Sequence, residues 1–251
     1  MLLVSDVHGA FGALAKVAAL GEPLLVLGDL LNFVDHRTHE GMLAEVAGRD
    51  AVARVAELRS RNDWEGARRV MRDIAAGREE EIRHAYRSLI DEAHAEAAAA
   101  LAGSGAVVTF GNVDHPGLLA AALPEGVRFV ESGVIEVEGL RIGVVGGGLP
   151  SVGGPGEVSD EAMRERLDSL GDVDVLCTHV APAVPQLCTD VVGGLPKGST
   201  PVKEYLLESG PRWHYFGDVH QPQATRWRVG RTACHNVGYF RATGRPVRHF
   251  P

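Results

Sequence analysis

Asp6 and His8 follow directly on an apolar run at the start of the chain, in residues 2–9. Side chains two residues apart on an extended segment point to the same side of the strand. A carboxylate oxygen and an imidazole nitrogen so aligned suit a divalent transition metal ion. Short Asp-x-His matches also occur by chance, as a strand end followed by a polar turn. The metal interpretation therefore depends on partners elsewhere in the chain.

The same pattern, an apolar run that ends in polar donors, recurs four more times. The later donors are Asp29, Asn112, His179, Asp218 and His220. In open α/β sheets, ligands gather outside the carboxyl ends of the strands, where these side chains would meet Asp6 and His8. The donors exceed what one ion takes and fit two ions that share a carboxylate, with Asp29 as the expected bridge. Such pairs of ions activate water and clamp a phosphoryl group during in-line displacement.

The elements that position these donors follow from the apolar periodicity. Apolar runs predict strands near residues 2–4, 24–27, 106–110, 127–130, 133–137, 140–145, 173–178, 213–216, 225–229 and 232–237. Helical spacing predicts helices near residues 11–20, 116–123, 159–170 and 201–207. The β-α-β order of the first thirty residues indicates a parallel sheet that is buried on both faces. The glycine-rich segment 146–156 lacks a phosphate-loop lysine, so we expect a flexible loop there and no nucleotide cradle.

Between about Phe33 and Gly105 the chain changes character, because Ala, Arg and Glu dominate and Pro is absent. This composition predicts a helical insertion, residues 33–105, within a single domain of residues 1–251. Asn62 or Asp63 is expected to cap one of its helices, and residues 79–101 to form another. The Ala-rich faces permit close packing, so the insertion is a cap over the site, an interface for a homo-oligomer, or only a hairpin on the flank.

The composition places further bounds on function. With 251 residues, 45% of them apolar and 23% charged, the chain can bury a core large enough to be stable without disulfide cross-links. Its formal net charge of -8 argues against long nucleic acids as partners. Its three cysteines, without a CxxC pair, indicate reduced thiols. No stretch of about eighteen apolar residues and no signal peptide is present, so we expect a cytoplasmic protein without a membrane span.

In this order, the motifs resemble those of the calcineurin-like metallophosphoesterase family. Its usual signature runs Asp-x-His, Gly-Asp, Gly-Asn-His-Asp/Glu, His and Gly-His-x-His, and its late Asn-Pro-Gly element is echoed by residues 236–238. The match covers nearly the whole chain outside the insertion. The resemblance implies an α/β fold, a four-layer αββα sandwich of two mixed sheets with a long helical insertion. It also implies one metal ion on Asp6, His8, Asp29 and His220, and a second on Asp29, Asn112, His179 and Asp218.

Asp218 is the first departure from the family pattern, because it stands where the first His of the last motif is usual. A carboxylate adds a negative charge and hardens the site. We therefore expect two divalent ions, with Mn²⁺ or Fe²⁺ favoured and Zn²⁺, Mg²⁺ or Ni²⁺ as alternatives. The other interpretation places Asp218 outside the coordination shell, with a weak second metal.

Val113 is the second departure, since it replaces the His that is thought to protonate the leaving oxygen in many family members. Valine donates no proton, which favours diesters with good leaving groups. His115 is a candidate general acid in its place, and the family motif places Asn112 and Asp114 in the catalytic group as well. His36 and His39 are alternatives at the start of the insertion.

The sequence thus predicts a binuclear metal-dependent phosphoesterase that acts on a small phosphoester by attack of a metal-bridging hydroxide. A phosphodiesterase is favoured over a phosphomonoesterase. The alternative is a metal-binding scaffold of the same fold that uses the helical insertion for protein-protein contact. Because such a scaffold is expected to have lost several donors and this chain is altered only at position 218, the enzyme is the favoured interpretation.

Overall fold

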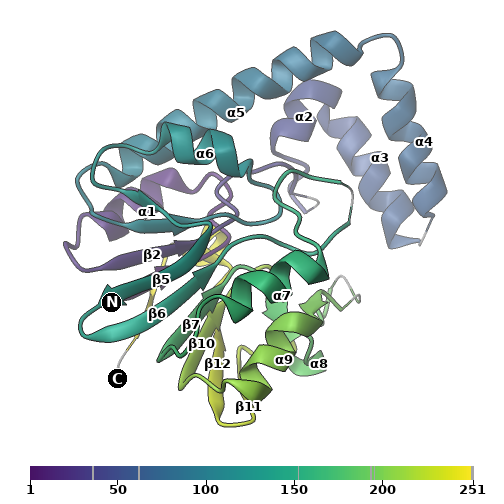
Figure 1. Cartoon of the computed structure of the whole chain (residues 1–251). Helices are drawn as coiled ribbons and strands as arrows, with labels where there is room; N and C mark the ends of the chain where they lie inside the picture. Colours follow the sequence, from purple (N-terminus) through teal and green to yellow (C-terminus); the bar gives the residue numbers. More distant parts are fainter. Residues whose placement is uncertain (36, 62, 152, 193, 195, 250–251) are drawn as a thin grey trace. The chain divides into compact units, whose positions relative to one another are not determined.

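The computed structural model describes residues 1–35, 37–61, 63–151, 153–192, 194 and 196–249 (Figure 1). They form two compact units, Met1–Leu30 with Glu96–Pro251, and Leu31–Ala95. The first unit contains both large sheets and all the predicted donors. The second unit is helical and, apart from its first two residues, lies within the predicted insertion 33–105.

The first sheet has the strand order β13-β1-β2-β3-β4. Its strands are β1 (Leu2–Val4), β2 (Leu24–Leu27), β3 (Val107–Thr109), β4 (Arg128–Phe129) and β13 (Val247–Arg248). The pairs from β1 to β4 are parallel, and β13 is antiparallel to β1. Every residue of β1 and β2 is buried, which explains their uninterrupted apolar sequences.

The second sheet has the order β11-β12-β10-β7-β6-β5. Its strands are β5 (Ser132–Val137), β6 (Leu140–Val145), β7 (Val175–Thr178), β10 (Trp213–Phe216), β11 (Arg226–Val229) and β12 (Thr232–Asn236). The central pairs β6-β7, β7-β10 and β10-β12 are parallel. The outer hairpins β5-β6 and β11-β12 are antiparallel, so both large sheets are mixed, as predicted.

The core lies between the two sheets. Leu3, Leu25 and Leu27 of the first sheet cluster with Ile142 and Val175 of the second. Outside the sheets lie α1 (Phe11–Ala18), α6 (Pro116–Ala122), α7 (Asp160–Asp168) and α9 (Thr200–Glu208) (Figure 1). The structure therefore confirms the four-layer αββα sandwich.

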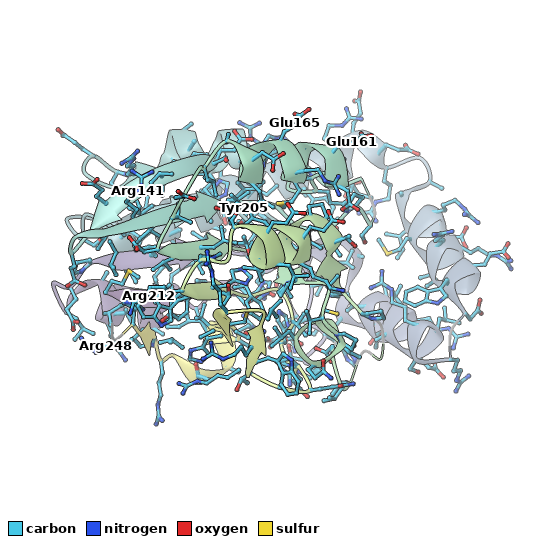
Figure 2. The ribbon with its side chains drawn as sticks, turned by 60° about the horizontal axis from the view of Figure 1, so that its bottom comes forward. Arg141, Glu161, Glu165, Tyr205, Arg212 and Arg248 are labelled. Carbon is cyan, nitrogen blue, oxygen red and sulfur yellow. The ribbon has the colours of Figure 1, made fainter. Side chains whose placement is uncertain are left out.

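The helices of the outer layer beside the second sheet have defined ends. Ser159 and Ser199 cap α7 and α9, because each hydroxyl accepts a hydrogen bond from the first helical turn. Tyr205 of α9, labelled in Figure 2, donates a hydrogen bond of 3.0 Å to the Gly171 carbonyl just beyond α7. The two helices are therefore tied to each other as well as to the sheet.

The second unit contains α2 (Met42–Ala47), α3 (Arg49–Ser60), α4 (Trp64–Ala75) and most of α5 (Glu79–Leu101). A small cluster around Leu43 and Val52 holds the helices together, and Phe33 stacks on Tyr86 at 5.5 Å. Asp63 caps α4 by accepting a hydrogen bond from the Gly66 amide, as predicted, whereas Asn62 lies outside the described residues. The expected helical character of this segment is thus confirmed.

The three cysteines, Cys177, Cys188 and Cys234, are buried and form no disulfide. Among the helices that the structure describes, none combines the length and the apolarity that a membrane crossing requires.

Candidate metal centre

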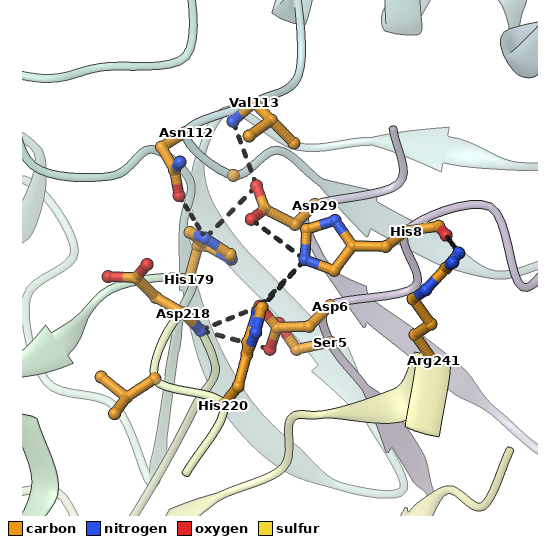
Figure 3. Close-up of polar contacts among 12 residues, drawn as sticks. Ser5, Asp6, His8, Asp29, Asn112, Val113, His179, Asp218, His220 and Arg241 are labelled. Carbon is orange, nitrogen blue, oxygen red and sulfur yellow. Dashed lines mark hydrogen bonds and ion pairs between the residues drawn. The ribbon is translucent and has the colours of Figure 1, made fainter. Parts of the chain in front are cut away.

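Five strands deliver the predicted donors to one place. In the first sheet, Asp6 and His8 follow β1, Asp29 follows β2 and Asn112 follows β3. In the second sheet, His179 follows β7, and Asp218 and His220 follow β10. Figure 3 shows Asp6, His8, Asp29, Asn112, His179 and His220 with their polar atoms facing a common centre. All these strands present their carboxyl ends there, because they are parallel to their neighbours within each sheet.

The distances between the donor atoms are those of ligands that share an ion. His8 Nε2 lies 3.2 Å from His220 Nε2 and 3.7 Å from Asp29 Oδ2. His179 Nε2 lies 3.5 Å from Asp29 Oδ1 and 3.2 Å from Asn112 Oδ1. Two ligands bound at about 2.1 Å around one ion are separated by roughly 3.0–3.4 Å. The donor atoms therefore need little movement to hold an ion.

The donors fall into two adjacent sets. One consists of Asp6, His8 and His220, and the other of Asp6, Asp29 and His179, with the donor atoms of each set within 4.8 Å of one another. The two oxygens of Asp29 also face different histidines, His8 on one side and His179 on the other. Mixed carboxylate and imidazole donors in two sets that share a carboxylate fit divalent metal ions.

The second nitrogen of His179 fixes which ring atom faces the site. His179 Nδ1 lies 2.8 Å from the carbonyl oxygen of Leu27, which can only accept a hydrogen bond. The ring therefore carries its proton on Nδ1 and presents Nε2 to the other donors, in the arrangement that metal-binding histidines use.

Burial lowers the pKa of His179, but the carboxylates of Asp29, Asp6 and Asp218 outweigh burial and raise it to about 9. In the metal-free protein this histidine is therefore protonated at neutral pH. A divalent cation held at Nε2 would replace that proton and would offset the carboxylate charge in its place.

His220 and Asp6 form the second charge pair of the centre, with His220 Nε2 3.5 Å from Asp6 Oδ1. Burial raises the pKa of Asp6, but the hydrogen bond and charge of His220 dominate and hold it well below its usual range. Burial lowers the pKa of His220, and its bond to Asp6 reverses the shift and raises it. Such mutual perturbation in one cluster is typical of functional sites.

The backbone at the donors is strained. Among the described residues, six that are not glycine have positive φ, and four of them are Asp6, His8, Asp29 and Asp218, at 58°, 41°, 53° and 64°. This region is costly for residues with a Cβ, although Asp and His tolerate it better than most. The concentration of strain at the donors indicates that the fold holds them in place for a function.

Three glycines allow the backbone to close around the two carboxylates. A Cβ at Gly217 or Gly238 would collide with Asp6 Oδ2, and one at Gly111 would collide with Asp29 Oδ1. The Val113 amide then donates a hydrogen bond of 3.1 Å to Asp29 Oδ1, and the Asp218 amide donates to both oxygens of Asp6 at 3.1 and 3.2 Å. Backbone groups thus orient both carboxylates.

We expect Gly217→Ala to lower the affinity for Mn²⁺ about 10- to 100-fold, the range seen when the groups that orient metal ligands are disturbed. The added methyl group would displace Ser5 Oγ and Asp6 Oδ2. Calorimetric titration with Mn²⁺ measures the effect. Gly117→Ala on α6 is the matched control, since its Cβ meets open space, and equal Mn²⁺ affinity in the two variants would contradict the prediction.

The loop after β3 contains Asn112, Val113, Asp114 and His115. The Asn112 side chain faces His179. Asp114 is buried, and its carboxylate accepts hydrogen bonds of 2.9 Å from the amides of Leu30 and Gly111, so it ties the loops after β2 and β3 together. His115 is exposed and precedes α6. The catalytic roles of these residues stay predictions.

The glycine-rich segment supports the Asn112 loop. Gly147 donates a hydrogen bond of 2.8 Å to the Phe110 carbonyl, and Gly148 donates one of 3.0 Å to Gly156. A Cβ at Gly148 would lie 2.5 Å from the Asn112 Cβ. The described part of this segment is therefore held against the loop after β3 that carries Asn112. The sequence predicts only a flexible loop here and does not predict this contact.

Asp218 is placed differently from the other donors. Its carboxylate belongs to neither set of donors within 4.8 Å, and Figure 3 draws it on the side of the cluster opposite His8. Its nearest charged partner is Lys197, whose Nζ lies 3.8 Å from Asp218 Oδ1. Burial raises the pKa of Asp218, and Lys197 and His179 oppose that shift.

Three residues at the site have no counterpart in the predicted motifs. The Tyr239 ring stacks on His220 with centroids 4.0 Å apart and an interplanar angle of 6°. Arg241 donates a hydrogen bond of 2.6 Å to the His8 carbonyl. Lys197 is the third. Tyr239 and Arg241 flank the start of α10 (Phe240–Thr243), just after the 236–238 element, and that position is the only sequence signal for them.

No protein-family model and no curated protein matches the chain, but solved structures share its fold. One is 17% identical, with a TM-score of 0.58, covering 95% of this chain and 90% of its own. The structure of TT1561 from Thermus thermophilus is 13% identical, with a TM-score of 0.54, covering 96% and 89%. The structure of a novel archaeal phosphodiesterase, 11% identical over 96% and 85%, has a TM-score of 0.37, which is too low to support an argument.

The architecture consists of two mixed sheets packed face to face. The donors at their carboxyl ends follow the order Asp-x-His, Asp, Asn, His and x-x-His along the chain. This is the fold that the resemblance to the calcineurin-like metallophosphoesterases implies. The donors of both sheets lie at this end of the sandwich, and the donor set fits divalent metal ions.

Proposed function

We propose that the chain is a binuclear metal-dependent phosphoesterase, and that its substrates are small phosphodiesters rather than monoesters. The observation that carries the proposal is the pair of donor sets that share Asp6, with the two Asp29 oxygens directed at different histidines. A single structural ion needs only one such set, whereas two adjacent sets match the two-metal class of phosphoester hydrolases, which hold two ions side by side.

Divalent ions held by these donors would supply Lewis-acid chemistry, activating water at neutral pH and offsetting charge on the phosphoryl group. The residues of the chain position these ions and the substrate. Asn112 brings an amide beside His179, where it can contact a phosphoryl oxygen. The stacked Tyr239 fixes the orientation of the His220 ring. Backbone amides hold the carboxylates, as described above.

The preference for diesters follows from position 113. The Val113 side chain cannot protonate a leaving oxygen, and only the amide of this residue contacts the site, through Asp29. His115 is exposed and directly precedes α6, so it can act as a general acid only if the leaving group of the substrate extends to it. A leaving group of low pKa needs no such help.

The test is hydrolysis of bis(p-nitrophenyl) phosphate and of p-nitrophenyl phosphate by the purified protein loaded with Mn²⁺. We expect turnover of the diester, slower turnover of the monoester, two ions per chain by elemental analysis, and loss of activity with chelator. A chain that binds two ions and prefers the monoester would overturn the diester assignment. Activity that survives complete removal of metal would overturn the mechanism.

The two candidate donor sets also support an enzyme over a metal-binding scaffold, because such a scaffold is expected to have lost several donors. A cytoplasmic location and assembly of copies through the helical insertion remain predictions. They are compatible with this function and do not depend on it.

A further inference from the structure

Lys197 lies beside the metal centre on a segment that is fixed at both ends. Its amide donates a hydrogen bond of 2.7 Å to the carbonyl of Cys188, the last residue of α8 (Pro185–Cys188). The next residue begins β9 (Gly198–Ser199), which pairs with β8 (Ala181–Pro182) in a two-stranded sheet. The Lys197 backbone therefore has little freedom to carry the side chain away from the site.

The same segment is fastened to the loop of His220. Asp190 accepts a hydrogen bond of 3.1 Å from the amide of Gln221, and the Val191 amide donates one of 2.9 Å to the Gln221 carbonyl. Residues 190 and 191 are thus tied to the loop after β10 that carries His220.

The ammonium group of Lys197 is only partly engaged. Its Nζ lies 3.8 Å from Asp218 Oδ1, a distance that holds an ion pair without a short hydrogen bond. The lysine side chain is 55% exposed, whereas that of Asp218 is 7% exposed. An ammonium group has three donors, and among the described residues Asp218 is the ion-pair partner of Lys197, which leaves donors for an anion that enters the site.

The charges explain why a lysine is needed here. Asp218 stands where the resemblance expects a neutral histidine, so it adds one negative charge to a centre that already contains Asp6 and Asp29. An anionic phosphoester approaching these carboxylates is repelled by the added charge. Lys197 supplies one positive charge at the same point and cancels it. The pair of Asp218 and Lys197 thus replaces a neutral residue without a change in net charge.

We propose that Lys197 binds a non-bridging oxygen of the substrate phosphoryl group, and that Asp218 holds this lysine and is not a metal ligand. The inference rests on the proposed phosphoesterase function for its biological meaning. The motifs of the family signature include position 218 but not Lys197. The inference gives the site a contact to the substrate anion that does not depend on the metal ions.

Binding of inorganic phosphate to the Mn²⁺-loaded protein tests the lysine, by calorimetric titration of the wild type, Lys197→Met and Lys197→Arg. We expect Lys197→Met to weaken phosphate binding about tenfold or more, the effect of removing one charge-assisted contact, and Lys197→Arg to retain most of it. With bis(p-nitrophenyl) phosphate, KM should rise more than kcat falls. Lys203→Met on α9 is the matched control and should match the wild type.

Counting the bound Mn²⁺ tests Asp218. The Asp218→Asn variant keeps the amide that holds Asp6, so we expect two ions per chain and phosphate binding at least as tight as in the wild type, because the lysine is released. Loss of one ion or weaker phosphate binding in Asp218→Asn, or wild-type phosphate affinity in Lys197→Met, would overturn the inference. A wild type that binds phosphate and two ions without hydrolysing any ester would overturn the proposed function and leave this test intact.

Discussion

Replacing Asp29 by Asn is expected to reduce Mn²⁺-dependent hydrolysis of bis(p-nitrophenyl) phosphate by a factor on the order of 10³ or more. Asp29 Oδ2 lies 3.7 Å from His8 and Asp29 Oδ1 lies 3.5 Å from His179, so its charge lies beside one histidine of each donor set. An asparagine has the same shape, and its amide oxygen can still accept the hydrogen bond from the Val113 amide. The fold is therefore retained while the shared charge is lost. Initial rates and the Mn²⁺ content of the purified variant measure the effect.

Asp168→Asn is the matched control, because Asp168 is an exposed carboxylate at the end of α7 in the same unit. It should leave both the rate and the metal content unchanged. If Asp29→Asn kept two ions and more than about a tenth of the activity, Asp29 would not be the shared ligand. Asp6, which belongs to both donor sets, would then be the candidate for that role.

The sequence predicts most of this centre because strand geometry leaves little choice. Asp6 and His8 come after a buried parallel strand, and the carboxyl ends of neighbouring parallel strands meet at one edge. The same reasoning places Asp29, Asn112 and His179. The place of each of these donors follows from the apolar run that precedes it in the sequence. The conformation of the loops does not enter the prediction.

The residues that the sequence did not reveal lie in irregular segments. Lys197 precedes a two-residue strand, and Tyr239 precedes a four-residue helix, too short to show any periodicity. The orientation of the Asp218 carboxylate is also absent from the sequence, because it depends on a positive φ of 64° and on a lysine 21 positions away. Contacts between such segments are decided by packing and not by local pattern.

Asp114 shows a third kind of limit. The family motif indicates an acidic residue at this position, and the structure gives it two amide partners from the loops after β2 and β3. A buried carboxylate that accepts two backbone hydrogen bonds stabilises the relative position of the loops. The motif thus marks a residue that positions Asp29 and Asn112, although the sequence alone does not separate positioning from contact with the substrate.

His214 is the buried group with the largest expected influence on stability. It lies on β10, and Thr178 Oγ1 is 2.9 Å from its Nε2. The Thr178 hydroxyl donates its only proton to the Val180 carbonyl at 2.7 Å, so the ring must donate from Nε2. His214 Nδ1 is buried and has no hydrogen-bond partner among the described residues. A proton on Nδ1 would therefore be buried without an acceptor.

Burial accordingly lowers the pKa of His214 from 6.5 to about 3. Because the folded pKa lies below the unfolded one, the unfolded chain binds more protons between these values. The folded state then loses stability as the pH falls from 6.5 toward 3, at up to about 1.4 kcal/mol per pH unit from this residue alone. Above pH 6.5 the residue is neutral in both states and adds no pH dependence.

The measurement is the free energy of unfolding by urea at several pH values for the wild type, His214→Phe and His214→Gln. Neither replacement titrates, and glutamine can still donate to Thr178 Oγ1, so at least one variant should keep the packing. Other titrating groups, including those of the metal centre, are common to all three proteins and cancel in the differences. We expect the wild type to lose stability relative to both variants as the pH falls below 6.5. Differences that stay constant down to pH 4 would show that His214 is protonated at no cost in the folded chain, contrary to its buried, unpartnered Nδ1.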